Sequence, residues 1–386
     1  KLYDVAVVGA GPTGAALSHF LSSKGFTVLV IEKDPQPGIR TICGEYLPDP
    51  SSLKLEGDVA SAYLDFFEPF IVHRMERIVM EIGNREFETN YAGYSVDRRA
   101  MIVSRLEESL AEGTILKTGE AFITARFVDD AYEVRTSKDR YRARYLVGAD
   151  GFDSRVAKLI NGSTTLKCDD LALAFSTEVT MEMNEPDVMR LVISESLAPG
   201  TYAWVIPRSE NTANVGVGVR LNMINGFDPK MALREHLARL NVTVEPELRG
   251  RYVPAGGMLG KVQEGGIFLA GDSAGMTVPS NGGGMHTGII AAYLLTRSLA
   301  DDRPEGYVPS VDRVVRPMVD TGLIHRRAAD FLLRTGLLRR TLRFLPHSLV
   351  EEVIRVERGP YYPLLKLLSL LYGQLRGKVG SYPACR

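Results

Sequence analysis

Three glycines and one carboxylate occur where the chain would hold a phosphate-bearing ligand. Gly9, Gly11 and Gly14 directly follow the apolar run 4–8 and open a predicted helix. Such glycines allow a tight turn, a close approach to a pyrophosphate and close packing of the helix on the strand. The N-terminus of that helix would then face the phosphate charge. Glu32 ends the next predicted strand, where a carboxylate can accept hydrogen bonds from ribose.

Two later segments have chemistry of the same kind. Asp150 lies in a glycine turn that follows a predicted strand and opens a helix, so it could serve ribose or phosphate groups, although the segment alone also fits a plain turn. Asp272 ends a second buried strand, 266–271, and Gly282–Gly284 precede a long predicted helix. Backbone N–H groups of these glycines, together with the helix dipole, would stabilise negative charge on a reduced flavin ring.

Composition narrows the class of protein. The chain has 386 residues, of which 45% are apolar and 24% charged, as in ordinary globular proteins of two to three domains. With 46 basic and 47 acidic residues, a general nucleic-acid binder is disfavoured. Residues 312–386 hold 14 of the basic and only 6 of the acidic residues. This basic, leucine-rich region could contact anionic lipid or an anionic substrate, or form a basic helical face in solvent.

The cysteines and the lengths of the apolar runs indicate in which cellular compartment the protein functions. Cys43, Cys168 and Cys385 form no disulfide framework, CxxC pair or zinc pattern, so we expect no metal and a reducing, cytoplasmic environment. The first residues read directly into a strand, so we expect no signal peptide. No uncharged apolar run reaches the length of about 18 residues that a membrane-spanning helix needs.

The order of predicted elements gives the architecture. A βαβ unit over 4–32 predicts a parallel sheet. A hairpin follows over 70–90, with its turn at Gly83-Asn84, and the region 171–219 is again rich in strands. Helices are predicted at 15–24, 97–110, 229–240 and 284–300 and, with breaks at Gly336, Pro346 and Gly359-Pro360, beyond Pro304.

We therefore predict an α/β (α+β) fold in which a sheet domain is inserted into a discontinuous nucleotide-binding domain. The nucleotide-binding domain comprises 1–69, 96–170 and 255–305, and the substrate-binding sheet domain comprises 70–95 and 171–254. A helical region, 306–386, ends the chain.

Together the three glycine-rich segments resemble the fingerprints of FAD enzymes of the para-hydroxybenzoate hydroxylase type. The resemblance covers about 300 residues and implies one FAD in a Rossmann-like domain. Arg98 resembles the family position that supports FAD, whereas from sequence alone it could lie on a solvated helix face. The cofactor-binding residues predicted in this way are Gly9, Gly11, Gly14, Glu32, Lys33, Arg40, Cys43, Gly44, Arg98, Asp150, Asp272, Gly283, Gly284 and Met285.

Two further segments resemble geranylgeranyl reductases, especially the archaeal enzymes that saturate isoprenoid lipid chains. Cys43-Gly44 matches their Cys-Gly pair near the flavin. Tyr202, Trp204 and Pro207 match their Tyr-x-Trp-x-Phe-Pro substrate motif, from which this chain departs with Ile206 at the Phe position. The resemblance implies that these three residues bind substrate.

The residues themselves leave some roles open. Tyr202 and Trp204 share one face of a predicted strand, where they form either an aromatic wall for a long apolar substrate or part of the core. Cys43 is our predicted catalytic residue, as a proton donor or redox thiol, although a lone cysteine can also be a small buried apolar residue. His286 follows the glycine run and could titrate near the flavin or simply pack in its helix.

We expect an FAD-dependent reductase that saturates C=C bonds of geranylgeranyl or other isoprenoid chains, in a lipid, a prenyl diphosphate or a quinone tail. Its external electron donor would be NAD(P)H, ferredoxin or another carrier. Its basic C-terminal region could contact a substrate headgroup or, peripherally, the membrane. The alternative is a flavin-dependent monooxygenase of an apolar or aromatic substrate. A quinone-reducing dehydrogenase with an iron–sulfur cluster is disfavoured, because three dispersed cysteines cannot form a Cys₄ site.

Overall fold

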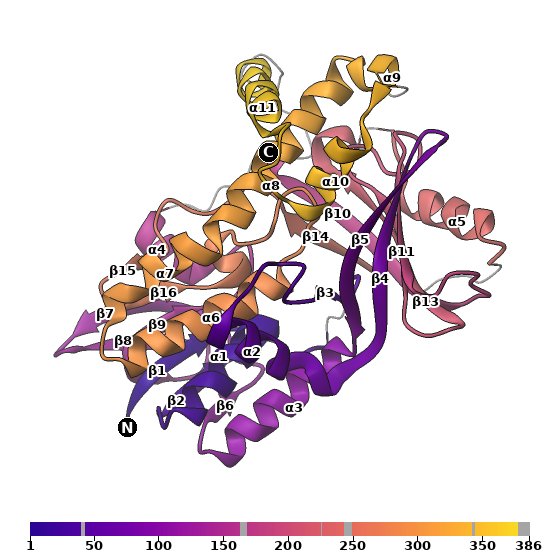
Figure 1. The fold of residues 1–386 in the computed structure, drawn as a ribbon. Coiled ribbons are helices and arrows are strands. Elements are labelled where there is room, and N and C mark those ends of the chain that lie inside the picture. Colours follow the sequence, from indigo (N-terminus) through magenta and orange to yellow (C-terminus); the bar gives the residue numbers. More distant parts are fainter. Residues whose placement is uncertain (40–42, 163–167, 225, 243–248, 342–343, 377–386) are drawn as a thin grey trace.

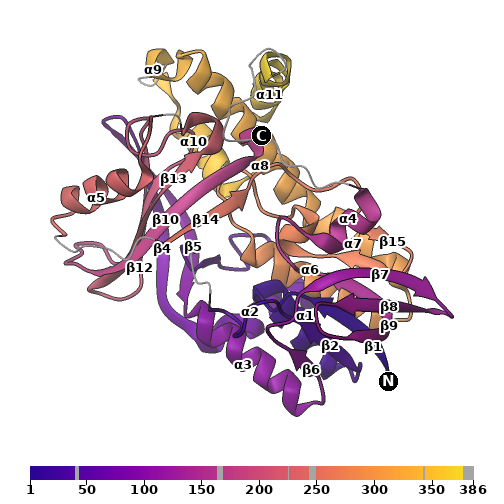
Figure 2. The ribbon, with the colours of Figure 1, turned by 180° about the vertical axis from the view of Figure 1, so that it is seen from behind.

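The structure is a computed structural model of the chain. It describes residues 1–386 except for 40–42, 163–167, 225, 243–248, 342–343 and 377–386. Two sheets lie beside each other, and helices of the C-terminal region cover the end where they meet (Figures 1 and 2).

The first sheet is mainly parallel. Its order is β15 (Gln263–Glu264), β16 (Ile267–Leu269), β9 (Arg140–Gly148), β1 (Leu2–Val8), β2 (Val28–Ile31) and β6 (Ile115–Lys117). The strands from β16 to β6 are parallel, whereas β7 (Phe122–Val128) and β8 (Ala131–Thr136) extend β9 as an antiparallel meander. Strands buried on both faces form continuous apolar runs, as in β1 and β2.

Three helices pack together beside this sheet. α1 (Pro12–Ser23) lies between α3 (Arg98–Ala111) and α6 (Met285–Ala300), while α2 (Gly57–Phe67) also packs on α6 and α4 (Arg155–Asn161) contacts β7. A Cβ at Gly288 of α6 would overlap Thr13 of α1, so the first turns of the two helices approach closely. Both helices therefore begin in one region, at the carboxyl ends of the parallel strands.

The second sheet is mainly antiparallel. Its order is β14 (Arg249–Pro254), β10 (Leu171–Thr180), β13 (Thr212–Arg220), β12 (Ala203–Pro207), β11 (Val188–Ile193), β4 (Ile71–Ile82), β5 (Arg85–Val96) and β3 (Tyr46–Pro48). α5 (Pro229–Arg239) covers one face, over the core that contains Val205 and Val215. The other face carries Trp204 and Ile206 and packs in part against α10 (His347–Arg355).

The chain ends in helices, as the sequence predicts. These are α7 (Tyr307–Val314), α8 (Arg316–Arg334), α9 (Leu337–Thr341), α10 and α11 (Tyr362–Arg376). Arg326 of α8 forms a buried ion pair at 3.2 Å with Asp170, at the start of the second sheet. Within the described residues, no helix combines the length and the apolar character needed to cross a bilayer.

The predicted fold class is confirmed, and so are the βαβ unit and the hairpin. α1 begins at Pro12, three residues earlier than predicted, because proline is favoured in the first turn of a helix. β3 lies within the range 1–69, assigned to nucleotide binding, but pairs with β5 in the second sheet. The domain boundaries therefore stay a proposal.

Candidate active site

The glycine turn between β1 and α1 is built as a ligand cradle. Gly9 has φ +102°, and a Cβ there would come within 2.8 Å of the Ala149 carbonyl carbon. A Cβ at Gly14 would overlap the carbonyl of Gly9. Around Gly11, in contrast, no atom of the described residues other than its own chain neighbours lies within 4 Å of where a Cβ would stand. Gly9 and Gly14 are thus required by packing, while the space beside Gly11 is open to a ligand.

Glu32 closes this cradle from the end of β2. One carboxylate oxygen accepts from the Ala10 N–H at 2.7 Å, and the other accepts from the Asp34 N–H at 2.8 Å. Each oxygen keeps a further lone pair, so the group can still accept from a ribose hydroxyl. Lys33 is exposed beside it, and Arg40 lies outside the described residues.

Asp150 has a structural role that the sequence only suggested. Its carboxylate accepts from the Ser154 hydroxyl at 2.5 Å and from the Arg155 N–H at 2.8 Å, so it stabilises the first turn of α4. Burial raises the pKa of Asp150, and these hydrogen bonds oppose that effect. Its contact with a cofactor stays a prediction.

The second glycine loop lies at the start of α6. Asp272 accepts from the Thr277 hydroxyl at 2.7 Å, and a Cβ at Gly284 would stand 2.8 Å from the same carboxylate oxygen. The Gly283 N–H donates to the Asn281 side chain at 2.9 Å. Met285 begins α6 and is half-buried. The loop therefore brings a helix N-terminus to this place, while the Gly283 N–H is engaged by Asn281. That the loop stabilises negative charge on a ligand stays a prediction.

His286 lies directly under this loop. It is 4% exposed, and a Cβ at Gly283 would stand 2.7 Å from its ring. Burial lowers the pKa of His286 to about 4. The imidazole is therefore neutral at physiological pH, which favours the packing interpretation over titration near the ligand.

These residues fit FAD. Two helix N-termini converge on the cradle, Gly11 leaves room for a pyrophosphate, and carboxylates stand at the ends of β2 and β16. When bound, FAD supplies the hydride chemistry that no side chain provides.

Arg98 is buried at the N-terminus of α3, with 5% exposure, so the solvated-face alternative is wrong. Burial lowers the pKa of Arg98, while the neighbouring Cys43, Glu45 and Asp272 raise it. Arg251 on β14 also points to this region, since its guanidinium lies 4.0 Å from the Asp272 carboxylate. Two cations thus stand near the predicted flavin site, of which the sequence analysis identified only Arg98.

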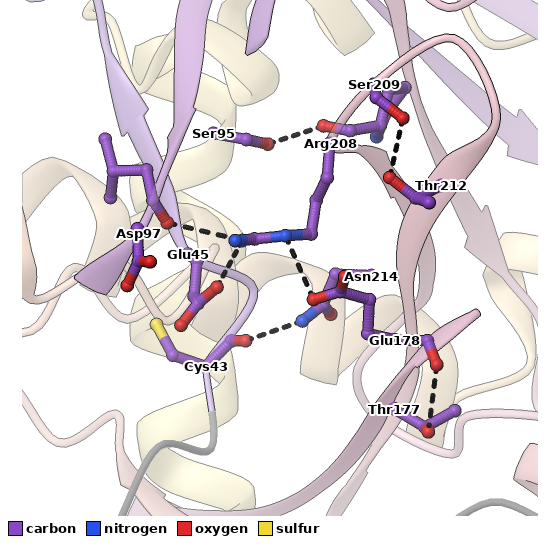
Figure 3. Close-up of polar contacts among 12 residues, drawn as sticks. Cys43, Glu45, Ser95, Asp97, Thr177, Glu178, Arg208, Ser209, Thr212 and Asn214 are labelled. Carbon is purple, nitrogen blue, oxygen red and sulfur yellow. Dashed lines mark hydrogen bonds and ion pairs between the residues drawn. The ribbon is translucent and has the colours of Figure 1, made fainter. Parts of the chain in front are cut away.

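The segment Cys43–Glu45 docks on the second sheet (Figure 3). The Cys43 carbonyl accepts from the Asn214 side chain at 3.0 Å, and the Glu45 carboxylate forms an ion pair with Arg208. A Cβ at Gly44 would come within 2.7 Å of Ile206. Gly44 is thus needed for close approach to β12, while the Cys43 side chain is half-buried.

The predicted substrate residues lie beside this segment. Tyr202 and Trp204 are edge-to-face, with ring centroids 6.0 Å apart, so the predicted shared face is confirmed. The Tyr202 hydroxyl donates to the carbonyl of Asn281 in the second glycine loop. Burial raises the pKa of Tyr202, so it stays protonated. Pro207 is buried, and its carbonyl accepts from the Ser95 hydroxyl at 2.5 Å.

The aromatic pair therefore connects the two halves of the site. Trp204 is 8% exposed and packs in the cluster of apolar residues on that face, so it also belongs to the core. The two alternatives of the sequence analysis, wall and core, coexist for this residue. Whether these side chains bind substrate stays a prediction.

Besides Arg251, three site residues had no predicted role: Glu45, Arg208 and Asn214. For two of these residues the sequence contains a pattern that could have indicated their position. Asn214 is the one polar residue in the buried run 213–219. Arg208 continues the alternation of Trp204 and Ile206, so it lies on their side of the strand.

Comparison with known proteins gives the same picture. A family model described as the geranylgeranyl reductase catalytic domain matches residues 170–248, and one described as an NAD(P)-binding Rossmann-like domain matches 7–57. Digeranylgeranylglycerophospholipid reductase 1 of Methanopyrus kandleri is 29% identical over 305 residues, which cover 76% of this chain and 79% of that protein. The corresponding reductase of Methanocella arvoryzae is 29% identical and covers 77% and 78%.

Solved structures agree in fold. A geranylgeranyl bacteriochlorophyll reductase-like protein from Thermoplasma acidophilum has a TM-score of 0.72 at 20% identity, covering 100% of this chain and 98% of that one. A probable FAD-dependent monooxygenase from Pseudomonas aeruginosa has a TM-score of 0.65 at 18% identity, covering 84% and 96%.

The fold, the glycine cradle and the matching family models define an α/β oxidoreductase with a Rossmann-like nucleotide-binding domain into which FAD fits. Within that class the chain is similar to geranylgeranyl reductases, because the catalytic-domain match spans β10 to α5 and the curated relatives match along most of the chain. The predicted resemblance is confirmed.

Proposed function

We propose that this protein is an FAD-dependent reductase that saturates C=C bonds of a geranylgeranyl lipid. The observation that carries the proposal is the junction of the aromatic pair with the second glycine loop, through the bond from Tyr202 to Asn281. It sets an apolar surface next to the predicted flavin site. The named relatives act on digeranylgeranylglycerophospholipids, which supports a substrate with long isoprenoid chains.

The chemistry assigns tasks to this chain's residues. An isolated alkene has no carbonyl to polarise, so it must be held in place and kept from water while hydride and proton are added. Tyr202, Trp204 and Pro207 would hold the chain, and the Cys43 thiol would deliver the proton. Arg98 and the N-terminus of α6 at Gly284 would stabilise negative charge, whereas the Gly283 N–H already donates to Asn281 and holds the loop in place.

Domain boundaries follow from the same proposal. Residues 1–69, 96–170 and 255–305 would carry FAD, 70–95 and 171–254 would carry substrate, and 306–386 would form the helical region. The parallel order of the first sheet and the mainly antiparallel order of the second support this division.

A cytoplasmic, membrane-peripheral location completes the proposal. Leu364, Leu367 and Leu370 on α11 are 50%, 53% and 62% exposed, and Phe344 is 68% exposed. α9 and α11 lie at the same end of the molecule in both ribbon views (Figures 1 and 2). Residues 331–350 and 358–386 contain no Asp or Glu. Exposed leucines on segments whose own charged residues are all basic suit an anionic lipid surface.

The proposed reaction is tested with the FAD-loaded protein under anaerobic conditions. The protein is incubated with chemically reduced flavin and digeranylgeranylglycerophospholipid, and the lipid is analysed by mass spectrometry. We expect addition of one H₂ for each double bond saturated. If the lipid is unchanged without oxygen but gains an oxygen atom in air, the protein is a monooxygenase and the proposal is wrong.

A further inference from the structure

Ile206 on β12 and Arg208 just after this strand contact successive residues of the Cys43–Glu45 segment. A Cβ at Gly44 would reach Ile206, and Glu45 pairs with Arg208 two positions further on. Trp204 precedes Ile206 on the same face and has no direct polar contact with Cys43. Its indole N–H donates instead to the Asn214 side-chain oxygen at 2.9 Å. The Asn214 amide nitrogen then donates to the Cys43 carbonyl at 3.0 Å.

Asn214 suits this position because of its two different polar atoms. The indole N–H of Trp204 only donates, and the backbone carbonyl of Cys43 only accepts. A bridge between them therefore needs one acceptor and one donor on the same short side chain, as a carboxamide has. Asn214 is 7% exposed, so a lost partner could not be replaced freely by water.

The Trp204 ring is also confined by the backbone of a neighbouring strand. On the neighbouring strand β13, a Cβ at Gly216 would overlap the six-membered ring of the indole. The ring thus lies directly over the backbone of Gly216, and the bond to Asn214 fixes its direction within that space. Asn214 and Gly216 are both on β13, so one strand sets both constraints.

We propose that Asn214 is a positioning residue that fixes Trp204 and Cys43 relative to each other. The inference rests on the proposed function for its effect on turnover, because it names the residue that would align the apolar wall with the proton donor. Its structural content, a coupling between one indole and one cysteine turn, is independent of the substrate.

Two optical and chemical signals report on this coupling directly. Trp204 is the single tryptophan of the chain, so intrinsic tryptophan fluorescence comes from this residue alone. The reactivity of the Cys43 turn is followed by the rate of iodoacetamide labelling of the Cys43 peptide, measured by mass spectrometry. Neither signal depends on turnover.

Three variants of the FAD-loaded protein are compared. Asn214→Leu removes both hydrogen bonds, whereas Asn214→Asp keeps the acceptor for Trp204 and loses the donor for Cys43. Asn161→Leu is the matched control, because Asn161 also bridges two distant segments, donating to the Lys261 carbonyl at 3.0 Å and accepting from the Lys261 N–H at 3.1 Å.

The expected pattern separates the variants. In Asn214→Leu the tryptophan emission shifts and Cys43 labelling accelerates about fivefold, the factor by which losing one ordinary hydrogen bond shifts a local opening equilibrium. In Asn214→Asp labelling accelerates while emission stays close to wild type. Asn161→Leu changes neither signal. A folded, FAD-loaded Asn214→Leu with both signals unchanged overturns the inference.

Trp204→Phe keeps the test decisive if Asn214→Leu fails to fold. This change removes the indole N–H, so Asn214 loses one restraint, and Cys43 labelling should accelerate with Asn214 in place. Unchanged labelling would overturn the coupling.

For turnover, Asn214→Asp should lower kcat more than it raises KM, because the substrate wall is intact while the proton donor is displaced. Failure of all variants and the wild type to reduce lipid would contradict the proposed function and leave the two coupling signals to be judged separately.

Discussion

Glu45 and Arg208 form an ion pair although 163 positions separate them in the chain. The same guanidinium donates to the Val96 carbonyl at 3.2 Å and lies 3.1 Å from Glu178, so it joins β5, β10 and the Cys43–Glu45 segment (Figure 3). Glu45 has φ +56°, a left-handed conformation that is unfavourable for a residue with a side chain. The ion pair therefore holds a strained backbone in place next to Cys43.

Arg208→Gln should destabilise the FAD-loaded protein by about 2 kcal/mol in urea unfolding, less than at a fully buried pair, because it removes the paired cation from the half-buried Glu45 while Arg98 stays near it. Burial already raises the pKa of Glu45, and Arg208 opposes that effect. The matched control is Arg126→Gln, which breaks an ion pair whose arginine is 70% exposed and should cost less than about 1 kcal/mol. Equal losses of unfolding free energy in the two variants would show that the pair of Arg208 and Glu45 stabilises the protein no more than an exposed pair does.

Gly11→Ala should weaken FAD binding at least about tenfold while the fold stays intact, because its methyl meets no other segment of the described chain and would intrude on the ligand. FAD content and the affinity of the apoprotein are measured by fluorescence titration. Gly373→Ala is the control, since its methyl also meets no other segment of the described chain but lies on α11. If Gly11→Ala unfolds the protein or retains full affinity, the cradle is not a pyrophosphate site.

Cys43→Ser should lower kcat for alkene reduction by about 10²-fold or more, because the hydroxyl is a far weaker acid of nearly the same size. Reduction of bound FAD by an artificial donor should be unaffected, and Cys43→Ala should be at least as impaired in alkene reduction. Near wild-type turnover in both variants would mean that the proton comes from another group or from water.

Stability should fall as pH decreases from about 6.5 to about 4, in part because of His286. Its pKa is lowered from 6.5 to about 4 in the folded protein, so within this interval the unfolded chain binds a proton that the folded protein does not. The contribution is complete above pH 6.5 and is lost by pH 4, with a size of up to about 3 kcal/mol. His286→Gln should flatten the curve of unfolding free energy against pH. An unchanged slope would show that His286 does not contribute to the pH dependence of stability.

Replacing Leu364, Leu367 and Leu370 together by Ser should lower binding to anionic phospholipid vesicles about tenfold or more. Binding is measured by co-sedimentation at low and high salt, and high salt should weaken the wild type because basic residues contribute. The control is Met231→Ser on α5, which removes an apolar side chain that is 64% exposed. Self-association of the wild type without vesicle binding would instead make α11 a protein interface.

The predictable parts of this molecule are those that local signals encode. The glycine turn from Gly9 to Gly14, the hairpin turn at Gly83-Asn84 and the breaks at Gly336 and Pro346 follow from backbone preferences of single residues. The contact of Cys43 with Asn214 does not, because it joins positions 171 apart and depends on how two sheets meet. Arg98 illustrates the same limit: a charged helix residue appears solvated until a neighbouring element buries it.

The chain passes between the two sheets four times, from β2 to β3, from β5 to β6, from β9 to β10 and from β14 to β15. Two domains joined by one linker can rotate about that linker, whereas several covalent connections at separate places restrict such a rotation. Opening the space between the glycine loops and the aromatic pair by a rotation of one whole sheet would strain all four connections at once. Any rotation of one sheet against the other would therefore have to bend the chain at four separate places.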